Sequence, residues 1–187
     1  MIDLNKQIDD LFSDQLMTWT LARSNYEQLR NLKVRELYFD GFKVILLFNP
    51  GRIRSSSASV DQKSVDARPC FLCKVNRPEE QKFVTTIGGL SILVNPFPIF
   101  WKHLTIVSEI HTDQRIFSRF SDLLGLAKLL PGFVIFYNGP ECGASAPDHF
   151  HFQAGNRESM PLEQDFKNGR YIKHIRSYDK ADVFIWK

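Results

Sequence analysis

The sequence predicts an α+β fold in which an antiparallel sheet packs with helices. Short apolar runs follow one another with turns of only a few residues between them, which is typical of antiparallel strands. Amphipathic stretches with helical spacing occur at the start of the chain and again near its middle. The chain of 187 residues has no repeats or low-complexity tracts and is long enough to bury a core. We expect a single domain over residues 1–187, with a helical segment over 1–32 and a sheet-based core over 33–187.

The composition is that of an ordinary globular protein, with 43% hydrophobic and 24% charged residues. The formal net charge of +3 is too small to argue for a nucleic-acid partner, and a small anionic ligand fits it equally well. The chain has no apolar run of about 18 residues and no signal-peptide block, so no membrane partner is expected. An odd number of cysteines, including one close pair, indicates a reducing compartment, and we expect a cytoplasmic protein.

Two helices and a hairpin are predicted in the first part of the chain. Apolar residues recur at helical spacing after Asp3, which is a suitable N-cap. Asp40-Gly41 separates two apolar runs, and both residues tolerate the positive φ that a tight hairpin turn needs. The elements expected here are a helix to about residue 16, a second helix up to residue 32, and strands over 34–39 and 42–48.

The rest of the chain predicts more strands and two more helices. Thr112 opens a run of apolar residues on one broad helical face, and Pro131-Gly132 ends it. The elements expected here are strands over 82–86, 90–95, 104–108, 133–137 and 149–154, helices over 112–130 and 161–166, and extended segments over 171–176 and 183–186.

The most informative segment is His149-Phe150-His151-Phe152-Gln153, in which polar and aromatic residues alternate. Successive side chains of a strand point to opposite faces. The two histidines and the glutamine would therefore share one face, while the two phenylalanines would anchor the other face in a core. Imidazole is a competent nucleophile near neutral pH, where a large neutral fraction persists. The alternative is that two strand histidines merely face solvent.

A nucleophilic imidazole at this place suits chemistry at a phosphorus atom. Attack on an α-phosphorus gives a phosphoramidate, a high-energy bond that a second acceptor can cleave, so one displacement is split into two. Gln153 can donate to a phosphate oxygen without supplying a proton for hydrolysis. The preceding Gly143-Ala144-Ser145 can bring backbone N–H groups and a hydroxyl close to phosphate. Catalysis would then depend mainly on positioning and charge stabilisation.

These residues resemble the transferase branch of the histidine-triad superfamily, which includes galactose-1-phosphate uridylyltransferase, diadenosine tetraphosphate phosphorylase and the GDP-hexose phosphorylases. The His-x-His-x-Gln signature of that branch matches residues 149–153. The resemblance implies a histidine-triad-like antiparallel sheet packed with helices, and it implies that His151, the second histidine, carries the nucleotidyl group. Gln153 implies transfer, because the hydrolase branches usually have histidine there. The sequence around the motif is most similar to GDP-hexose phosphorylases, and the chain also resembles an uncharacterised bacterial family.

The resemblance also implies a metal site. Cys70 and Cys73 match the zinc-bearing segment of the uridylyltransferases, and a Cys-x-x-Cys pair can chelate Zn²⁺ through both thiolates. Those relatives imply that His111 and His149 complete a Cys₂His₂ set. The zinc would be structural, holding His149 without activating water. The alternatives are a redox pair, two idle thiols, or His103 as the third ligand in place of His111.

Further residues match positions that contact the nucleotide in this branch. Arg52 and Arg54 would share a strand face, and their guanidinium forks suit phosphates, with a solvated loop edge as the alternative. Asn95 and Phe97 resemble a strand end that lies against the nucleoside, and plain core packing is the alternative for Phe97. Asn138 can bond a phosphate or the backbone of the nucleophile. The expected phosphate- and nucleotide-binding residues are Arg52, Arg54, Asn95, Phe97, Asn138, Gly143 and Ser145.

The chain departs from these relatives in three ways. Asp148 stands where relatives often have another residue, and the spacing from Ser145 to His149 is one residue longer than in the uridylyltransferases. The relatives also contain two related halves, whereas this chain has room for one. Part of an acceptor site would then come from a second subunit or be missing, and we expect a homodimer.

The sequence thus predicts a nucleotidyltransferase or phosphorylase that works through a nucleotidyl–His151 intermediate, with structural Zn²⁺ as its cofactor. The expected donor is a nucleoside diphosphate sugar or a dinucleoside polyphosphate, and the expected acceptor is phosphate or a sugar phosphate. One rival is a nucleotide-binding regulatory domain of the same fold that has lost turnover. A second rival is a zinc-stabilised nucleic-acid-binding module, which the mild charge and the lack of a dense Lys/Arg stripe count against.

Overall fold

The computed structural model describes residues 3–40, 42–49, 61–86, 88–140, 142–169, 173–178 and 181–185. The chain divides into two compact units. The first is formed by Met1–Leu32 and Asn49–Asn156, and the second by Lys33–Phe48 and Arg157–Lys187. The expectation of one domain over the whole chain therefore stays a prediction.

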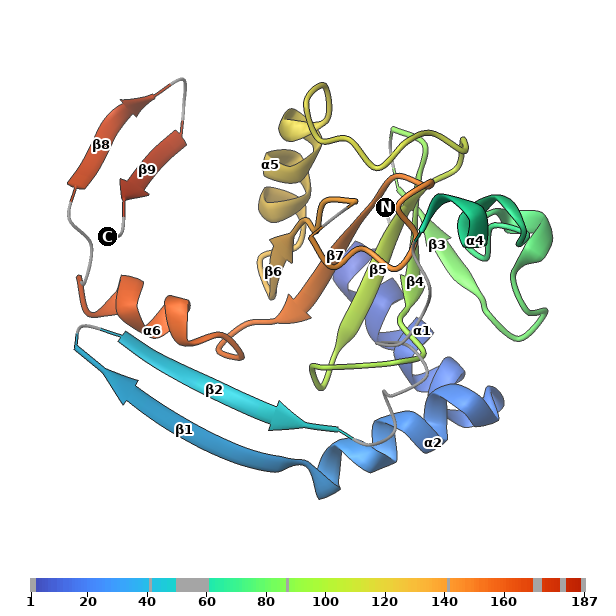
Figure 1. Cartoon of the computed structure of the whole chain (residues 1–187), viewed down its shortest axis with the longest axis horizontal. Coiled ribbons are helices and arrows are strands. Elements are labelled where there is room, and N and C mark those ends of the chain that lie inside the picture. Colours follow the sequence, from blue (N-terminus) through green and yellow to red (C-terminus); the bar gives the residue numbers. More distant parts are fainter. Residues whose placement is uncertain are drawn as a thin grey trace. The chain divides into compact units, whose positions relative to one another are not determined.

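A five-stranded sheet forms the centre of the first unit, with strand order β3-β4-β5-β7-β6 (Figure 1). Every pair of neighbouring strands is antiparallel, which confirms the predicted α+β class. The expected strands are present with small shifts at their ends: β3 Phe83–Thr85, β4 Leu90–Val94, β5 His103–Ser108, β6 Phe133–Phe136 and β7 His151–Asn156.

Helices cover one face of this sheet. The Asp3 carboxylate caps the first helix by accepting a hydrogen bond from the Asn5 N–H at 3.0 Å. Phe12 and Tyr26 meet edge to face in the core between helices and sheet, with ring centroids 5.9 Å apart. The helices that contribute to this core are α1 Leu4–Thr18, α2 Thr20–Gln28 and α5 Phe120–Leu129. Short helical turns complete the unit: η1 Leu29–Asn31, α4 Gln62–Asp66 and η3 Lys74–Asn76.

The opposite face of the sheet carries most of the polar candidate residues. Side chains alternate along each strand, so Ile92 and Ile106 enter the helical core while Leu93 and Val107 face the other way. Leu93 and Val107 pack there in a smaller apolar cluster that contains Cys70, Leu72 and Ala146. The loop that bears the cysteines is thereby anchored on the sheet.

The helix expected from Thr112 begins only at Phe120, so the prediction is wrong for the preceding residues. The backbone of this segment is bonded elsewhere. The Thr112 carbonyl accepts from the Phe150 N–H at 2.7 Å, and the Gln114 N–H donates to the Pro147 carbonyl at 3.3 Å. In a helix the Thr112 carbonyl would accept from the N–H four residues later. Tertiary hydrogen bonds have therefore overridden a helical pattern of apolar residues.

The strand expected from His149 begins at His151. The His149 N–H donates to the Ala146 carbonyl at 3.4 Å, so His149 lies in a turn that precedes the strand. His151 and Gln153 alternate with Phe152, which is buried in the helical core. The predicted common face is therefore found for His151 and Gln153, whereas His149 approaches from the turn.

The second unit contains two hairpins and a helix. β1 Lys33–Phe39 and β2 Phe42–Phe48 pair in the register that brings their two ends together around residues 40–41, which confirms the predicted hairpin. α6 Pro161–Lys167 lies against β2. β8 Lys173–Tyr178 pairs with β9 Ala181–Ile185, in agreement with the two expected extended segments.

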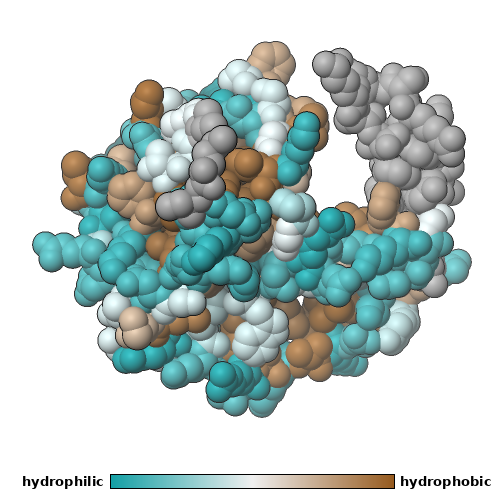
Figure 2. Space-filling model, turned by 180° about the vertical axis from the view of Figure 1, so that it is seen from behind, coloured by the Kyte–Doolittle hydropathy of each residue, from teal (hydrophilic) through white to brown (hydrophobic). Residues whose placement is uncertain are grey.

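The surface is mixed in character. Figure 2 shows one face of the molecule, on which apolar residues lie as separate patches among hydrophilic ones. Within the described ranges, no helix is both long enough and apolar enough to cross a membrane.

Candidate active site

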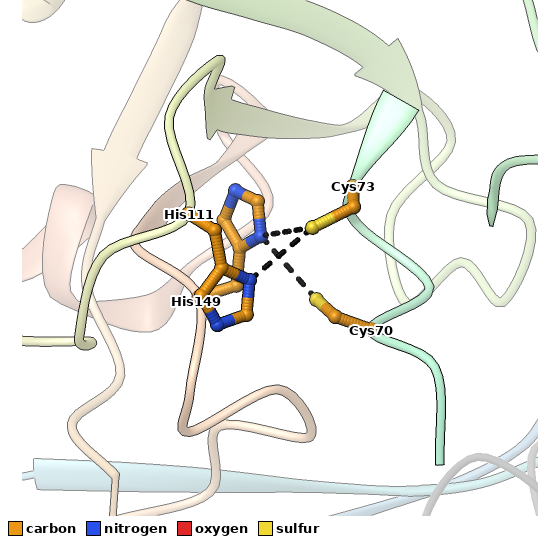
Figure 3. Close-up of side chains that lie close together, drawn as sticks. All are labelled: Cys70, Cys73, His111 and His149. Atoms are coloured by element: carbon orange, nitrogen blue, oxygen red, sulfur yellow. Dashed lines mark hydrogen bonds between the residues drawn. The ribbon is translucent and has the colours of Figure 1, made fainter. Parts of the chain in front are cut away.

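The two cysteines of the candidate metal site lie on a tight turn. The Cys73 N–H donates to the Cys70 carbonyl at 3.2 Å, and the Asn76 side-chain amide donates to the same carbonyl at 2.9 Å. The Arg77 Nε–H donates to the Leu72 carbonyl at 2.8 Å and closes the loop. This turn directs both sulfur atoms to the same side (Figure 3).

Four ligand atoms from separate parts of the chain meet at this turn. One atom each of Cys70, Cys73, His111 and His149 lies within 4.8 Å of all the others. His149 Nδ1 is 3.3 Å from Cys70 Sγ and 3.5 Å from Cys73 Sγ, and His111 Nδ1 is 3.2 Å from Cys73 Sγ. Nitrogen and sulfur ligands of a tetrahedral Zn²⁺ stand about 3.5 Å apart. The four side chains can therefore hold a metal ion such as zinc.

The proton placement on His149 also suits a metal ligand. Its Nε2 lies 2.8 Å from the Ser108 carbonyl oxygen, so Nε2–H donates and Nδ1 keeps its lone pair toward the sulfur atoms. Burial lowers the pKa of His149, and the hydrogen bond to Ser108 offsets only part of this effect. The ring is thus a neutral imidazole whose orientation is set by a backbone carbonyl, as metal-binding histidines usually are.

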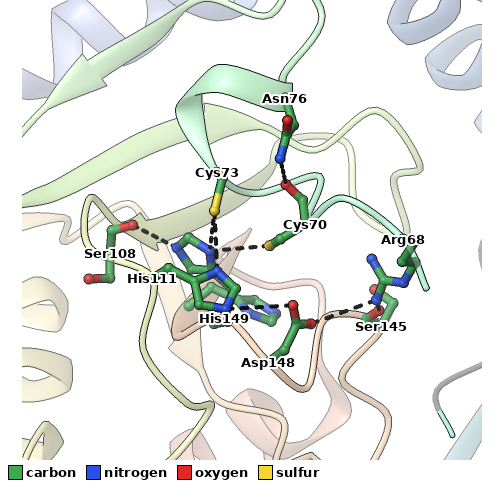
Figure 4. Close-up of polar contacts among 10 residues, drawn as sticks. Arg68, Cys70, Cys73, Asn76, Ser108, His111, Ser145, Asp148 and His149 are labelled. Atoms are coloured by element: carbon green, nitrogen blue, oxygen red, sulfur yellow. Dashed lines mark hydrogen bonds and ion pairs between the residues drawn. The ribbon is translucent and has the colours of Figure 1, made fainter. Parts of the chain in front are cut away.

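An ion pair lies beside the cluster (Figure 4). Asp148 Oδ2 is 3.8 Å from Nε2 of His111, and Asp148 Oδ1 is 3.7 Å from Nη2 of Arg68. The same Arg68 nitrogen donates to the Ser145 carbonyl at 3.1 Å.

Burial raises the pKa of the Cys73 thiol, and the neighbouring Cys70 sulfur raises it further. Two adjacent thiolates would therefore need a cation between them.

His151 is the buried first residue of β7. Its Nδ1 is 2.8 Å from the His149 carbonyl oxygen, so Nδ1–H donates and Nε2 carries the lone pair. Burial lowers the pKa of His151, and the hydrogen bond to the carbonyl offsets part of that effect. The imidazole is therefore neutral at pH 7, and Nε2 has no hydrogen-bond partner among the residues that the structure describes.

Gln153 is oriented by His103, a residue of the neighbouring strand. The Ile99 N–H donates to Nδ1 of His103 at 3.3 Å, which leaves the ring proton on Nε2. That Nε2–H donates to Oε1 of Gln153 at 2.9 Å. The amide oxygen is thus occupied, and within the described ranges no partner is found for the amide nitrogen. Gln153 therefore offers hydrogen-bond donors to a ligand.

The candidate residues at the strand ends form hydrogen bonds or packing contacts within the chain. The Asn95 amide donates to Thr105 Oγ1 at 3.0 Å and accepts from the Phe97 N–H at 2.9 Å. Phe97 is half-buried. The Asn138 carbonyl accepts from the Gln114 side chain at 2.9 Å. Contact of Asn95, Phe97 or Asn138 with a nucleotide stays a prediction.

The loop between β6 and β7 contains the next two candidates. Gly143 has a φ of 94°, a left-handed conformation that suits glycine. Ser145 turns its carbonyl toward Arg68 and is half-buried. Arg52 and Arg54 lie outside the described residues, and their role also stays a prediction.

Two residues of the site were not found by reasoning from the sequence. Gln114 lay inside the segment assigned to a helix. His103 was considered only as an alternative metal ligand or a packing residue, and it does not join the cluster. The register that pairs Thr105 with Gln153 and His103 with Gly155 reveals its role, because it places the His103 ring diagonally across from Gln153.

The chain is similar to several solved structures. Yeast Ap4A phosphorylase Apa2 in complex with Ap4A is 19% identical with a TM-score of 0.53, and the match covers 89% of this chain and 60% of that one. The same phosphorylase with AMP is 19% identical with a TM-score of 0.48, covering 90% and 57%. A histidine triad protein from Clostridium difficile is 16% identical with a TM-score of 0.36, covering 49% of this chain and 90% of that one. This chain thus spans about 60% of the phosphorylase.

No curated protein sequence matches the chain. A family model described as "Domain of unknown function (DUF4922)" matches residues 11–156, a range that contains the four candidate ligands, His151 and Gln153. The antiparallel sheet and its helices agree with the predicted histidine-triad-like architecture. The chain therefore belongs to the DUF4922 family, and it has a histidine-triad-like fold.

Proposed function

We propose that this protein is a nucleotidyltransferase that carries the nucleotidyl group on Nε2 of His151. The proposal depends on the burial, protonation and hydrogen bonding of that imidazole. It is buried and neutral, it donates through Nδ1 to the His149 carbonyl, and its Nε2 has no partner among the described residues. Such an imidazole is a nucleophile that needs no separate general base.

The reaction proceeds in two displacements. Nε2 of His151 attacks the α-phosphorus of the donor, an N–P bond forms, and the bond to the leaving phosphate oxygen breaks. The positive charge that develops on the ring is stabilised by the Nδ1–H hydrogen bond to the His149 carbonyl. An oxygen of the acceptor phosphate then attacks the same phosphorus, the N–P bond breaks, and Nε2 regains its lone pair.

Gln153 supports transfer over hydrolysis. Its amide oxygen is occupied by His103, so it meets a phosphate with N–H groups. An amide stabilises the oxygen atoms of the phosphorus centre but cannot give a proton to a leaving group or take one from water. The backbone N–H groups of the loop around Gly143 and Ser145 are proposed to add further donors.

Cys70, Cys73, His111 and His149 are proposed to hold Zn²⁺. The ion, when bound, neutralises the thiolates and cross-links three segments of the chain, and a complete set of four protein ligands leaves no position for water. Because the His149 carbonyl accepts the Nδ1 proton of His151, a ligand set that holds His149 also aims the ring of His151.

The donor is proposed to be a dinucleoside polyphosphate or a nucleoside diphosphate sugar. Similarity to a phosphorylase solved with Ap4A supports the first, and the residues around the motif support the second. Both donors present an α-phosphorus with a phosphate leaving group, and the acceptor is phosphate or a sugar phosphate. We also propose that the protein is a homodimer in which a second copy completes the acceptor site.

Mass spectrometry of the intact protein tests this proposal. The chain is incubated without acceptor with Ap4A or with each of a panel of nucleotide sugars. We expect an acid-labile adduct of one nucleotidyl group that phosphate or a sugar phosphate then removes. The adduct should be absent in His151→Ala and present in His174→Ala, a histidine outside the motif.

Two results would contradict the proposal. An adduct that persists in His151→Ala would show that another residue is the nucleophile. Nucleotide binding without an adduct from any donor would favour the regulatory domain that has lost turnover.

A further inference from the structure

Gln114 is a buried residue that the chemistry described above does not use. Its side chain is completely buried, and it lies in the segment between His111 and α5 where a helix was expected. We infer that Gln114 is a positioning residue that sets the place of His151 relative to the loop between β6 and β7. This inference rests on the proposed role of His151 as nucleophile and adds the residue that positions it.

The side chain of Gln114 bonds both backbone groups of His151. Oε1 accepts from the His151 N–H at 2.7 Å, and Nε2 donates to the His151 carbonyl at 2.9 Å. β6 pairs with β7 only as far as the Phe136–Gln153 pair, so His151 lies beyond the end of β6. A side-chain amide carries the same donor and acceptor as a peptide group. Gln114 thus takes the place of the strand residue that β6 lacks.

Gln114 also holds both ends of the loop that follows β6. Its Nε2 donates to the Asn138 carbonyl at 2.9 Å, and its backbone N–H donates to the Pro147 carbonyl at 3.3 Å. The Tyr137 hydroxyl donates to the Gln114 carbonyl at 2.7 Å. One residue therefore fixes the nucleophile and the two ends of the proposed phosphate-binding loop, and so the distance between them.

The expected consequence is kinetic. Displacement of reacting groups by about 1 Å can slow a reaction about 10²-fold. Gln114→Met keeps the length of the side chain and removes all three of its hydrogen bonds. We expect nucleotidylation of His151 to become about 10²-fold slower, while all of the folded protein is still labelled in the end.

The chain offers a matched control. Gln15 of α1 is also completely buried. Its side-chain amide also bonds backbone groups through both its nitrogen and its oxygen. Its Nε2 donates to the Glu80 carbonyl at 2.7 Å, and its Oε1 accepts from the Lys82 N–H at 3.2 Å. Gln15→Met should lose stability by the same kind of change, yet its rate of nucleotidylation should equal that of the unaltered protein.

Single-turnover labelling followed by mass spectrometry separates positioning from folding. A slower rate constant with full final labelling in Gln114→Met, and not in Gln15→Met, supports the inference. An unchanged rate constant overturns it, and so does a lower final labelling at the unchanged rate, which would mean a purely structural role. Saturation with donor should not restore the rate, since the defect lies in the chemical step and not in binding.

A second measurement keeps the inference independent of the proposed activity. Amide exchange followed by NMR reports the His151 N–H directly. Gln114→Met should speed exchange at His151 while the amides of β5 keep their protection. If the unaltered protein forms no adduct with any donor, the proposed function fails, but unchanged exchange at His151 is what would overturn the positioning role.

Discussion

At the scale of single residues, backbone groups decide which imidazole nitrogen of three histidines is available. The Ser108 carbonyl holds the proton of His149 on Nε2, so Nδ1 faces the cysteines. The His149 carbonyl holds the proton of His151 on Nδ1, so Nε2 is left for chemistry. The Ile99 N–H occupies Nδ1 of His103, so that ring donates through Nε2. The hydrogen-bond partners of these three histidines thus determine which ring nitrogen carries the proton and which carries the lone pair.

The position of His103 depends in turn on a glycine. A Cβ atom at Gly155 would lie 2.6 Å from Cδ2 and 2.8 Å from Cγ of Phe100, closer than such atoms approach. The Phe100 ring meets the His103 ring edge to face with centroids 5.4 Å apart, and the Phe136 ring stacks on the His103 ring with centroids 6.3 Å apart. Because Gly155 has no side chain, the Phe100 ring can lie close to the backbone at position 155 and contact the His103 ring.

Gly155→Ala should destabilise the protein for this reason. Displacing the Phe100 ring should lower the free energy of unfolding by about 1–3 kcal/mol, and it should slow nucleotidylation because His103 would shift against Gln153. Denaturant unfolding measures the first effect. Gly125→Ala in α5 is the matched control, since no neighbouring atom lies within 4 Å of its added Cβ, and it should raise stability by about 0.5–1 kcal/mol. A Gly155→Ala protein as stable as the original would contradict this account.

At the scale of elements, the candidate metal ligands come from turns that the sheet supports. The turn with Cys70 and Cys73 packs on Leu93 and Val107 of the sheet, whereas His149 enters from the turn before β7. Each turn is shaped by its own hydrogen bonds, and the four candidate ligand atoms meet where the turns come together.

Asp148→Asn tests the support of the metal site. The carboxylate lies between His111 and Arg68, and loss of its charge should weaken the orientation of the His111 ring. We expect about 10- to 100-fold weaker zinc binding, measured by competition with a chromogenic chelator. Asp113→Asn is the matched control, because that exposed carboxylate pairs only with Arg115 among the described residues and should leave zinc affinity unchanged. Equal affinities in both variants would remove Asp148 from the site.

The elements with local signals could be predicted from the sequence. The Asp3 cap and the Asp40-Gly41 turn signal depend on neighbouring residues alone, and both the helix and the antiparallel pair of strands were found. The segment after Thr112 has the apolar pattern of a helix, but its backbone bonds to residues that lie far along the chain. A periodic pattern does not contain those partners, so the start of α5 could not be placed.

The same limit applies to the site. The four candidate ligands followed from a resemblance to known sequences, and the structure brings their donor atoms together. His103 and Gln114 act across strands, and their partners depend on register and on where β6 ends. A single sequence without those pairings yields candidates for the reacting residues but not the residues that position them.

At the scale of the whole molecule, the family match and the first unit end at the same place. The match covers residues 11–156, and Asn156 is the last residue of the first unit. Every described residue of the candidate site belongs to this unit. The segments of the second unit, Lys33–Phe48 and Arg157–Lys187, contain none of these described side chains.

This organisation predicts different concentration dependences for the two half-reactions. The groups proposed for nucleotidylation of His151 all come from one chain, so its rate constant should not change with protein concentration. If a second copy completes the acceptor site, transfer to phosphate should become faster per molecule as the dimer forms. Stopped assays over a dilution series, with the mass of the assembly measured by light scattering, test this. Transfer that stays equally fast in the monomer would exclude a shared acceptor site.

The alternation of side chains through the sheet also bears on how such a protein can change over generations. Ile106 and Phe152 are buried in the helical core, while their immediate neighbours Thr105 and Gln153 lie on the opposite face of the sheet, which carries the candidate site. A mutation on that face leaves the core contacts of the neighbouring residues in place. During evolution, the residues on this face of the sheet can therefore change while the core that stabilises the fold stays the same.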